Sequence, residues 1–361
     1  MAWTFLPMIQ QVKTHQERLI TMSKAIRLAL GLIVKNEAED LPKCLASFLP
    51  EVDFVYILDT GSTDDTIQIA RRLLGEYDPF VPHVVEQFLG ANDDQGRIMD
   101  FSLARNTCTK GIEGLNGTEL ACDYIVFVDA DDILTTPGIK AALMAQPADY
   151  YSINYRMNPT FDFLSYKIWK TERKGRFTAR VHETLCVDWT KKVVNLDLEF
   201  LHHWSVIPGQ ESSTERNMRI LKAEIYPPLR SLFYWANENV DAKNYPEAIK
   251  WYLEYIRRAK EGEPCWQIEF HHCYWRAARW LQSLGRSTEA IALCKELLAK
   301  DSSWSEAWCE LAYIAKVYGD IPLMREYCLA ALKNKYTRRL FSEEDKYGTT
   351  PAWLLAQEAN K

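Results

Sequence analysis

The sequence has no Cys-x-x-Cys pair and no dense group of cysteines. Its nine cysteines are an odd number and are scattered over 361 residues. Such a set excludes a disulfide framework and is typical of reduced, mostly buried thiols. We therefore expect a cytoplasmic protein.

Long apolar runs are also missing. No stretch reaches the roughly 18 apolar residues that a transmembrane helix needs. The first 25 residues lack an apolar core region and a small-residue cleavage site, so the sequence predicts neither a membrane span nor a signal peptide.

Charge of one sign does not dominate either. Lys and Arg total 43 against 49 Asp and Glu, which gives a net charge of −6 and a pI near 5.8. This balance argues against general nucleic-acid binding. Hydrophobic residues make up 47% of the chain, so the composition is globular, and the length favours two or three domains.

The strongest local signal is an apolar run that ends in carboxylates. Residues Tyr124 to Val128 are aromatic or β-branched, which predicts a strand buried on both faces. Asp129, Asp131 and Asp132 follow it and need a cation or donors nearby. Mg²⁺ and Mn²⁺ prefer oxygen ligands, and open α/β sheets bind ligands beyond their carboxyl ends. We predict a metal–diphosphate site, with an acidic turn or helix cap as the alternative.

The N-terminal half alternates between strand and helix patterns, which predicts a parallel sheet of βαβ units. The expected domain is 26–207, behind an extension at 1–25. Ser62 or Thr63 is expected to cap the helix that begins near Asp65. Expected strands are 26–34, 54–58, 83–88, 124–128, 150–157, 166–169 and 198–202, and expected helices are 41–49, one from about 65, 101–109 and 139–144.

Helical periodicity takes over after residue 208. Tyr274 and Trp308 occupy equivalent places in two helix pairs and are 34 residues apart, the period of a tetratricopeptide repeat. Three such pairs, about the minimum for a stable stack, are expected in 208–361. An irregular helical bundle is the alternative. This region could bind a peptide or protein acceptor, or mediate a homodimer.

Five segments together resemble the family 2 glycosyltransferases with the GT-A fold, over roughly residues 27–205. Four of them are VKNEAEDLPKCLASF, ILDTGSTDDT, FSLARN and FVDADDIL. The fifth, YKIWKTERKGRFTARVHETL, is similar to the R-V-H-E block of the lipooligosaccharide β-glucosyltransferase subgroup. The resemblance implies an α/β catalytic domain with a Rossmann-like, mostly parallel sheet, followed here by the all-α repeat domain.

The resemblance also implies roles for the acidic residues. Asp131, in the DxD motif, is the expected metal ligand, and Asp129 would face the ribose or the metal. Asp132 would contact the donor sugar as a catalytic residue, or simply cap the next helix. His182 is the expected histidine ligand, with a backbone-bonded structural histidine as the alternative. The cation is expected to be Mn²⁺ or Mg²⁺.

Further positions are expected to bind the nucleotide-sugar. Asn36 and Glu37 would line the nucleotide pocket. Asp59 would accept the uracil N–H, or else cap a turn; many relatives carry a second acidic residue where Thr60 stands here. Arg105 would bond the diphosphate or hold the acidic loop, with a surface or structural ion pair as the alternative.

Inversion at the anomeric carbon needs a base that takes the acceptor's proton. Glu183 is the first candidate, with Asp162 and Asp188 behind it. Neighbours on a strand point to opposite faces, so His182 and Glu183 could serve one site together only if their segment is a loop.

The expected function is that of a metal-dependent inverting glycosyltransferase. It would move a hexose, with glucose as the first choice, from a UDP-sugar to a glycan, peptide or protein. One alternative is a non-catalytic scaffold on a degenerate transferase domain. Another is a nucleotidyltransferase. That class is expected to have a glycine- and basic-rich loop after the first strand, where this sequence has Lys35-Asn36-Glu37.

Overall fold

The structure is a computed structural model that describes residues 26–77, 79–158, 161–203, 211–336 and 343–359. The expected N-terminal extension, 1–25, lies outside these residues. The chain forms two compact units. Unit 1 comprises Met1–Thr178 and Glu183–Ile207, and unit 2 comprises Ala179–His182 and Pro208–Lys361. The short segment Ala179–His182 therefore belongs with the helical unit, although its neighbours on both sides belong with the first.

Within the described residues, unit 1 is built on an eight-stranded sheet with the order β3-β2-β1-β4-β7-β6-β10-β5. Parallel pairs join β1 to β2 and β4, β2 to β3, and β6 to β10. Strand β7 is antiparallel to β4 and β6, and β5 is antiparallel to β10. The bounds are β1 Leu28–Val34, β2 Phe54–Asp59, β3 His83–Gln87, β4 Tyr124–Asp129, β5 Asp132–Leu134, β6 Tyr150–Asn158, β7 Phe161–Lys170 and β10 Val193–His202.

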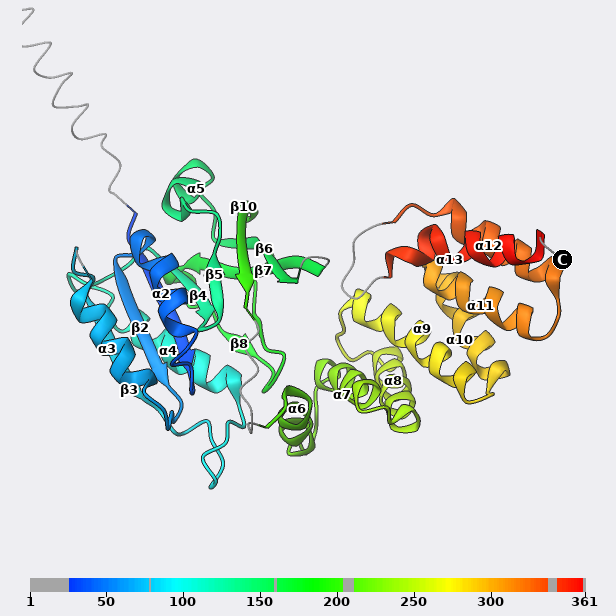
Figure 1. Ribbon diagram of the computed structural model, residues 1–361, viewed down its shortest axis with the longest axis horizontal. Coiled ribbons are helices and arrows are strands. Elements are labelled where there is room, and N and C mark those ends of the chain that lie inside the picture. The colour runs from blue at the N-terminus through cyan, green and yellow to red at the C-terminus, as the bar shows by residue number, and fades with distance from the viewer. Residues whose placement is uncertain (1–25, 78, 159–160, 204–210, 337–342, 360–361) are drawn as a thin grey trace, which may run out of the picture. The chain divides into compact units, whose positions relative to one another are not determined.

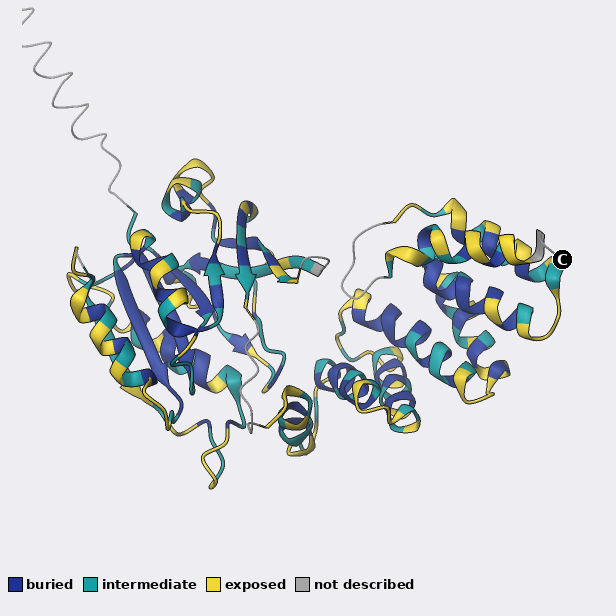
Figure 2. Ribbon diagram, viewed as in Figure 1, coloured by how far each residue is buried: buried dark blue, intermediate teal, exposed yellow. Residues whose placement is uncertain are grey.

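Helices cover both faces of this sheet, which explains why its central strands are continuous apolar runs (Figures 1 and 2). On one face, α2 (Leu41–Phe48), α3 (Thr66–Glu76) and α5 (Ile139–Ala145) pack on alternate residues of β1 and β4. On the other face, α4 (Phe101–Glu113) packs with the short ribbon of β8 (Phe177–Thr178) and β9 (Thr184–Leu185).

The parallel register brings three strand ends to one edge of the sheet. Val34, the last residue of β1, lies opposite Asp59 of β2, and Ile33 lies opposite Asp129 of β4. The loops that follow these strands therefore meet at the carboxyl edge, where α/β sheets bind ligands.

Unit 2 is a series of antiparallel helix pairs with a common apolar core. Gly285 and Gly319 both adopt a φ of 75°, end the first helix of their pairs, and are 34 residues apart. Each helix pair has a left-handed backbone turn at this place, and glycine adopts that conformation without the steric cost of a Cβ atom. The helices are α6 Ser213–Lys222, α7 Leu229–Asp241, α8 Tyr245–Lys260, α9 Gln267–Ser283, α10 Ser287–Lys300, α11 Ser305–Val317, α12 Ile321–Lys333 and α13 Thr349–Ala359.

The predicted fold class is confirmed: an α/β domain with a mostly parallel sheet precedes an all-α domain. Two local predictions are wrong. Helix α3 has Asp65 at its N-cap without a side-chain cap bond, and the Ser62 hydroxyl instead accepts from the backbone amide of Asn36. Asp132 begins strand β5 and caps no helix, whereas the helix expected at 139–144 is present as α5. In the described part of the chain, no helix combines the length and apolarity that a membrane crossing requires.

Candidate active site

Asp129 ends β4, Asp131 lies in the turn that follows, and Asp132 begins β5; this segment, 129–132, is called the acidic loop below. Strand β10 approaches it because His202 pairs with Asp132 in the β10–β5 register. The amide of His203 also donates to the Asp131 carbonyl at 2.8 Å. These backbone bonds fix His202 beside the loop.

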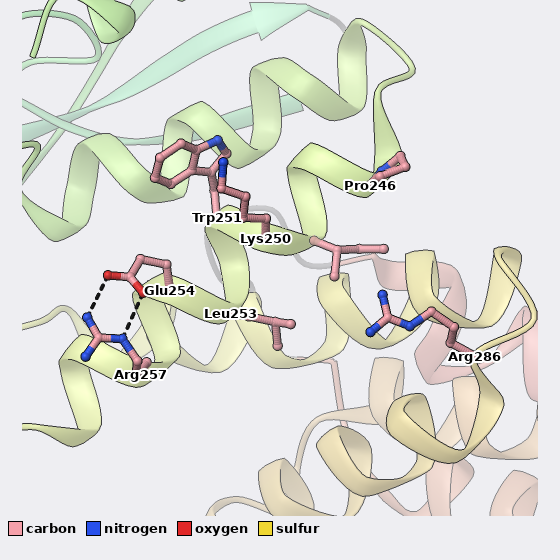
Figure 3. Close-up of a pocket in the computed structure, with 8 residues that line it drawn as sticks. Pro246, Lys250, Trp251, Leu253, Glu254, Arg257 and Arg286 are labelled. Carbon is pink, nitrogen blue, oxygen red and sulfur yellow. Dashed lines mark hydrogen bonds and ion pairs between the residues drawn. The ribbon is translucent and has the colours of Figure 1, made fainter.

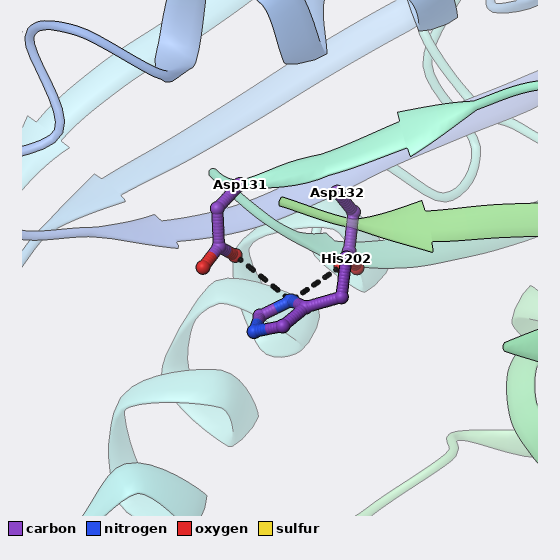
Figure 4. Close-up of side chains that lie close together, drawn as sticks. All are labelled: Asp131, Asp132 and His202. Atoms are coloured by element: carbon purple, nitrogen blue, oxygen red, sulfur yellow. Dashed lines mark hydrogen bonds and ion pairs between the residues drawn. The ribbon is translucent and has the colours of Figure 1, made fainter. Parts of the chain in front are cut away.

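Asp131, Asp132 and His202 form a cluster whose ligand atoms lie within 4.8 Å of one another (Figure 4). The His202 Nδ1 atom is 3.4 Å from Asp131 Oδ1 and 3.2 Å from Asp132 Oδ1. Among the described residues this is the one such group of three. Two carboxylates and an imidazole form a donor set that suits Mn²⁺ and accommodates Mg²⁺.

The members of the cluster differ in accessibility. The Asp132 side chain is fully buried, whereas that of Asp131 is 24% exposed. Asp132 accepts from the Tyr155 hydroxyl and, at 3.0 Å, from the Asp129 amide. These bonds give Asp132 the role of holding the acidic loop in shape. Because the Asp132 side chain is fully buried, the structure does not support its predicted contact with the donor sugar. The alternative prediction, that Asp132 caps a following helix, is wrong because strand β5 follows.

Asp129 is held by two cations. The Arg105 guanidinium donates to Oδ1, and the Lys167 ammonium lies 3.1 Å from Oδ2. Burial alone would raise the pKa of Asp129, but Arg105 and Lys167 outweigh it and hold that pKa below its usual range. Asp129 is therefore a firmly ionised member of the loop.

Arg105 reaches the loop from α4 and is 8% exposed. Its Nε atom donates to Glu183, so the guanidinium bridges Glu183 and Asp129. The rings of Phe127 and Phe177 lie 5.2 and 5.5 Å from it. Of the roles predicted for Arg105, the structure shows a buried ion pair that holds the acidic loop.

Glu183 is the predicted general base, and its ion pair with Arg105 argues against that role. Its side chain is 11% exposed. This carboxylate is already bonded to a buried guanidinium, so it is not placed to accept the acceptor's proton. Its observed contact positions Arg105 and, through it, Asp129. Of the two candidates behind it, Asp188 accepts from the amide and hydroxyl of Thr190.

Asp131 and Glu37 carry the least well compensated charge of the site. Burial, followed by the charge of Asp129, raises the pKa of Asp131 to about 7. Burial and then the charge of Asp131 raise the pKa of Glu37 to about 8. A bound divalent cation would relieve this repulsion.

The raised pKa of Glu37 predicts a pH-dependent effect on stability. In the unfolded chain Glu37 ionises near the ordinary glutamate pKa of 4.5, and in the folded protein only near about 8. The folded state therefore binds more protons between these values, and Glu37 costs increasing stability as the pH rises through that window. We expect Glu37→Gln to melt above the parent at about pH 8, with a gain that vanishes near about pH 4.5.

Melting curves in the presence of a chelator measure this difference. Glu39→Gln, which removes an exposed neighbouring carboxylate, should show no comparable trend with pH. A pH-independent difference for Glu37→Gln would contradict the assigned burial of this carboxyl group.

The predicted nucleotide-binding residues lie on the neighbouring loops. Asn36 has a φ of 58°, and its Oδ1 accepts from the Thr63 amide at 2.7 Å. This bond ties the loop after β1 to the loop after β2. Asp59 is fully buried and accepts from the amides of Gly61 and Ser62 and, at 2.9 Å, from Gln87 Nε2. Asp59 therefore has the turn-capping role, the alternative to binding the uracil N–H.

The histidine of the cluster is His202, and the prediction of His182 is wrong in this structure. His182 belongs to unit 2. Its Nε2 atom lies 2.9 Å from Glu238 Oε1, and its ring stacks on Tyr234 with centroids 3.8 Å apart. Arg230 Nε donates to the His182 carbonyl at 3.1 Å. His182 is thus a structural histidine, although its ring is bonded to the Glu238 side chain and not to the backbone as the alternative expected.

Sequence reasoning missed His202, Tyr155 and Lys167. His202 is the last residue of β10, just as Asp59 and Asp129 are the last residues of β2 and β4. This shared position at a strand end is the sequence feature that could have identified His202 as a site residue. Lys167 and Tyr155 lie inside strands and carry no such signal. The Lys167 ammonium lies 4.6 Å from the centroid of the Tyr155 ring, which belongs to the neighbouring strand.

Unit 2 contains a surface depression between α8 and the start of α10 (Figure 3). Its charged side chains are already matched within the unit: Lys250 pairs with Glu247, Arg257 with Glu254, and Arg286 with Glu289. The depression shows no converging polar groups that would define a ligand.

Comparison with known proteins supports a relationship to sugar-transferring enzymes. Over 164 residues the chain is 28% identical to glycosyltransferase SunS, known from Bacillus subtilis and its phage SPbeta. The chain is similar to a glycosyltransferase. The match covers 43% of this chain and 34% of SunS, so the chain spans about a third of the length of these relatives. No protein-family model matches the chain.

Other similarities are local or distant. A TPR repeat-containing protein of Synechococcus elongatus is 34% identical over 108 residues, which is 30% of this chain and 21% of that protein. Among solved structures, the mannosyltransferase PcManGT of Pyrobaculum calidifontis, in complex with GDP-Man and Mn²⁺, aligns at a TM-score of 0.41 and 14% identity, covering 90% of this chain and 94% of that one. The TPR2B domain of yeast Sti1 aligns at 0.29 and 20% identity, covering 37% of this chain and 96% of that one.

Proposed function

We propose that this chain is a metal-dependent inverting glycosyltransferase. It transfers a hexose, with glucose as the first candidate, from a UDP-sugar to a glycan, peptide or protein acceptor. The observation that carries the proposal is the Asp131–Asp132–His202 cluster at the carboxyl edge of the sheet. The similarity to SunS supports the same reaction class.

Asp131 and His202 would hold the cation, Mn²⁺ or Mg²⁺, because they are the accessible members of the cluster. The cation would stabilise the negative charge that grows on the departing diphosphate. Asp132 would orient this pair through its bonds to Tyr155 and to the loop backbone. This arrangement resembles other metal sites, in which buried hydrogen-bond partners orient the ligands.

The donor would lie along the loops after β1, β2 and β4. Asn36 and Glu37 would line the nucleotide pocket, and Asp129 would face the ribose. Arg105 would act through Asp129, because its guanidinium is already bonded to two carboxylates. Asp59 would shape the pocket by capping the turn that presents Gly61 and Ser62.

A donor screen tests the proposal. The protein is incubated with Mn²⁺ and each of several UDP- and GDP-sugars, and released nucleotide is measured by mass spectrometry. We expect slow hydrolysis of one UDP-sugar and a rise in melting temperature with Mn²⁺ plus UDP. Release of pyrophosphate from UTP would instead identify a nucleotidyltransferase. No response to any nucleotide would favour the scaffold.

A further inference from the structure

Lys167 places a positive charge inside the acidic site. Its ammonium lies 3.1 Å from Asp129 Oδ2 and 3.4 Å from Asp132 Oδ2, and the side chain is 12% exposed. The ring of Tyr155 packs against it, with the ammonium 4.6 Å from the ring centroid. Lys167 is therefore a nearly buried cation that bridges the first and last carboxylates of the acidic loop.

This contact limits what the loop can offer to a metal ion. Asp132 uses one oxygen toward Lys167 and the other toward His202 and Tyr155. Asp129 uses one oxygen toward Lys167 and the other toward Arg105. Asp131, whose carboxylate faces His202 rather than Lys167, and His202 itself would be the ligands, and a divalent cation bound to them would lie close to the ammonium. Like charges at such short range in a poorly solvated site repel strongly.

We propose that Lys167 is a built-in counter-ion that makes binding of the divalent cation depend on the nucleotide diphosphate. This inference rests on the proposed function. A diphosphate brings negative charge and further oxygen ligands, so it offsets the repulsion and completes the coordination of the cation. Lys167 also keeps the acidic loop folded when neither ligand is bound. The donor and the cation therefore enter together, and the protein alone holds the cation weakly.

The experiment compares the parent protein with Lys167→Gln and Lys167→Arg. Binding of Mn²⁺ alone is measured by calorimetry, and melting temperatures are recorded with Mn²⁺, UDP, GDP, and Mn²⁺ plus each nucleotide. For the parent we expect little effect of Mn²⁺ alone and a clear rise with Mn²⁺ plus one nucleotide. Lys167→Gln should melt lower without metal and bind Mn²⁺ alone about tenfold more tightly or better, because the repelling charge is gone. Lys167→Arg keeps the charge and should behave like the parent.

Lys170→Gln is the matched control, since Lys170 lies on the same strand and pairs with Asp149 at 3.5 Å, outside the acidic loop. It should leave Mn²⁺ binding unchanged. If the parent binds Mn²⁺ equally well with and without nucleotide, the role of Lys167 is overturned whether or not Lys167→Gln folds. It is also overturned if Lys167→Gln folds and gains no affinity for Mn²⁺ alone. If no combination of Mn²⁺ and nucleotide changes the melting temperature of the parent protein, the proposed function is refuted instead.

Discussion

Replacing Asp131 by asparagine is expected to abolish stabilisation by Mn²⁺ plus UDP and to lower the rate of sugar transfer by about a hundredfold or more. A metal ion contributes several kcal/mol to stabilising a charged leaving group, and each ~1.4 kcal/mol is a factor of ten in rate. Asp129 and Asp132 cannot take over, because Arg105 and Lys167 already hold them. Thermal melting and initial rates measure the two effects.

The same substitution should not unfold the protein. The pKa of Asp131 is about 7 in the folded state, against an ordinary aspartate pKa of 3.8 in the unfolded chain. Its ionised form therefore costs stability above about pH 7, and this cost decreases as the pH falls toward the unfolded value. Without metal, Asp131→Asn should melt at or above the parent near neutral pH. Asp197→Asn, at an exposed position on β10, is the control. Retained Mn²⁺-dependent stabilisation in Asp131→Asn would place the cation elsewhere.

Replacing Arg105 by methionine is expected to cost about 3 kcal/mol or more of unfolding free energy. Removing one partner from a buried ion pair leaves a buried charge uncompensated, which typically costs about 3–5 kcal/mol. Here two carboxylates, Asp129 and Glu183, lose their partner at once. Urea denaturation monitored by tryptophan fluorescence measures the loss.

A double substitution separates this electrostatic cost from lost packing. Arg105→Met combined with Glu183→Gln should recover part of the loss, because one of the two orphaned charges is removed. Arg97→Met is the surface control: its pair with Asp93 is 44% and 23% exposed and should be worth at most about 1 kcal/mol. An Arg105→Met variant as stable as the Arg97→Met variant would show that the bridge contributes little.

Charges rather than apolar contacts distinguish this site from the rest of the domain. The acidic loop sits at the end of β4, whose apolar residues are fully or nearly fully buried. Its carboxylates are contacted by Arg105 from α4, Lys167 from β7 and His202 from β10. Three elements far apart in the sequence therefore share one group of carboxylates.

The sequence alone determined the elements that depend on local pattern. The apolar runs of β1, β2 and β4, the helical faces between them and the 34-residue spacing of the repeat each follow from side-chain periodicity, and each lies where it was expected. The position of Asp131 also followed, because a carboxylate directly after a buried central strand must lie at the carboxyl edge of the sheet.

Only the tertiary structure decided which side chains meet those carboxylates. His202 reaches Asp131 through the antiparallel pairing of β10 with β5, a three-residue strand that has too few residues to show a period. Lys167 reaches Asp129 through the pairing of β7 with β4. His182 and Glu183 are neighbours in sequence, yet one bonds Glu238 in the helical unit and the other bonds Arg105 in the α/β unit. Local sequence carries no information on such contacts, because strand pairing and long-range packing select them.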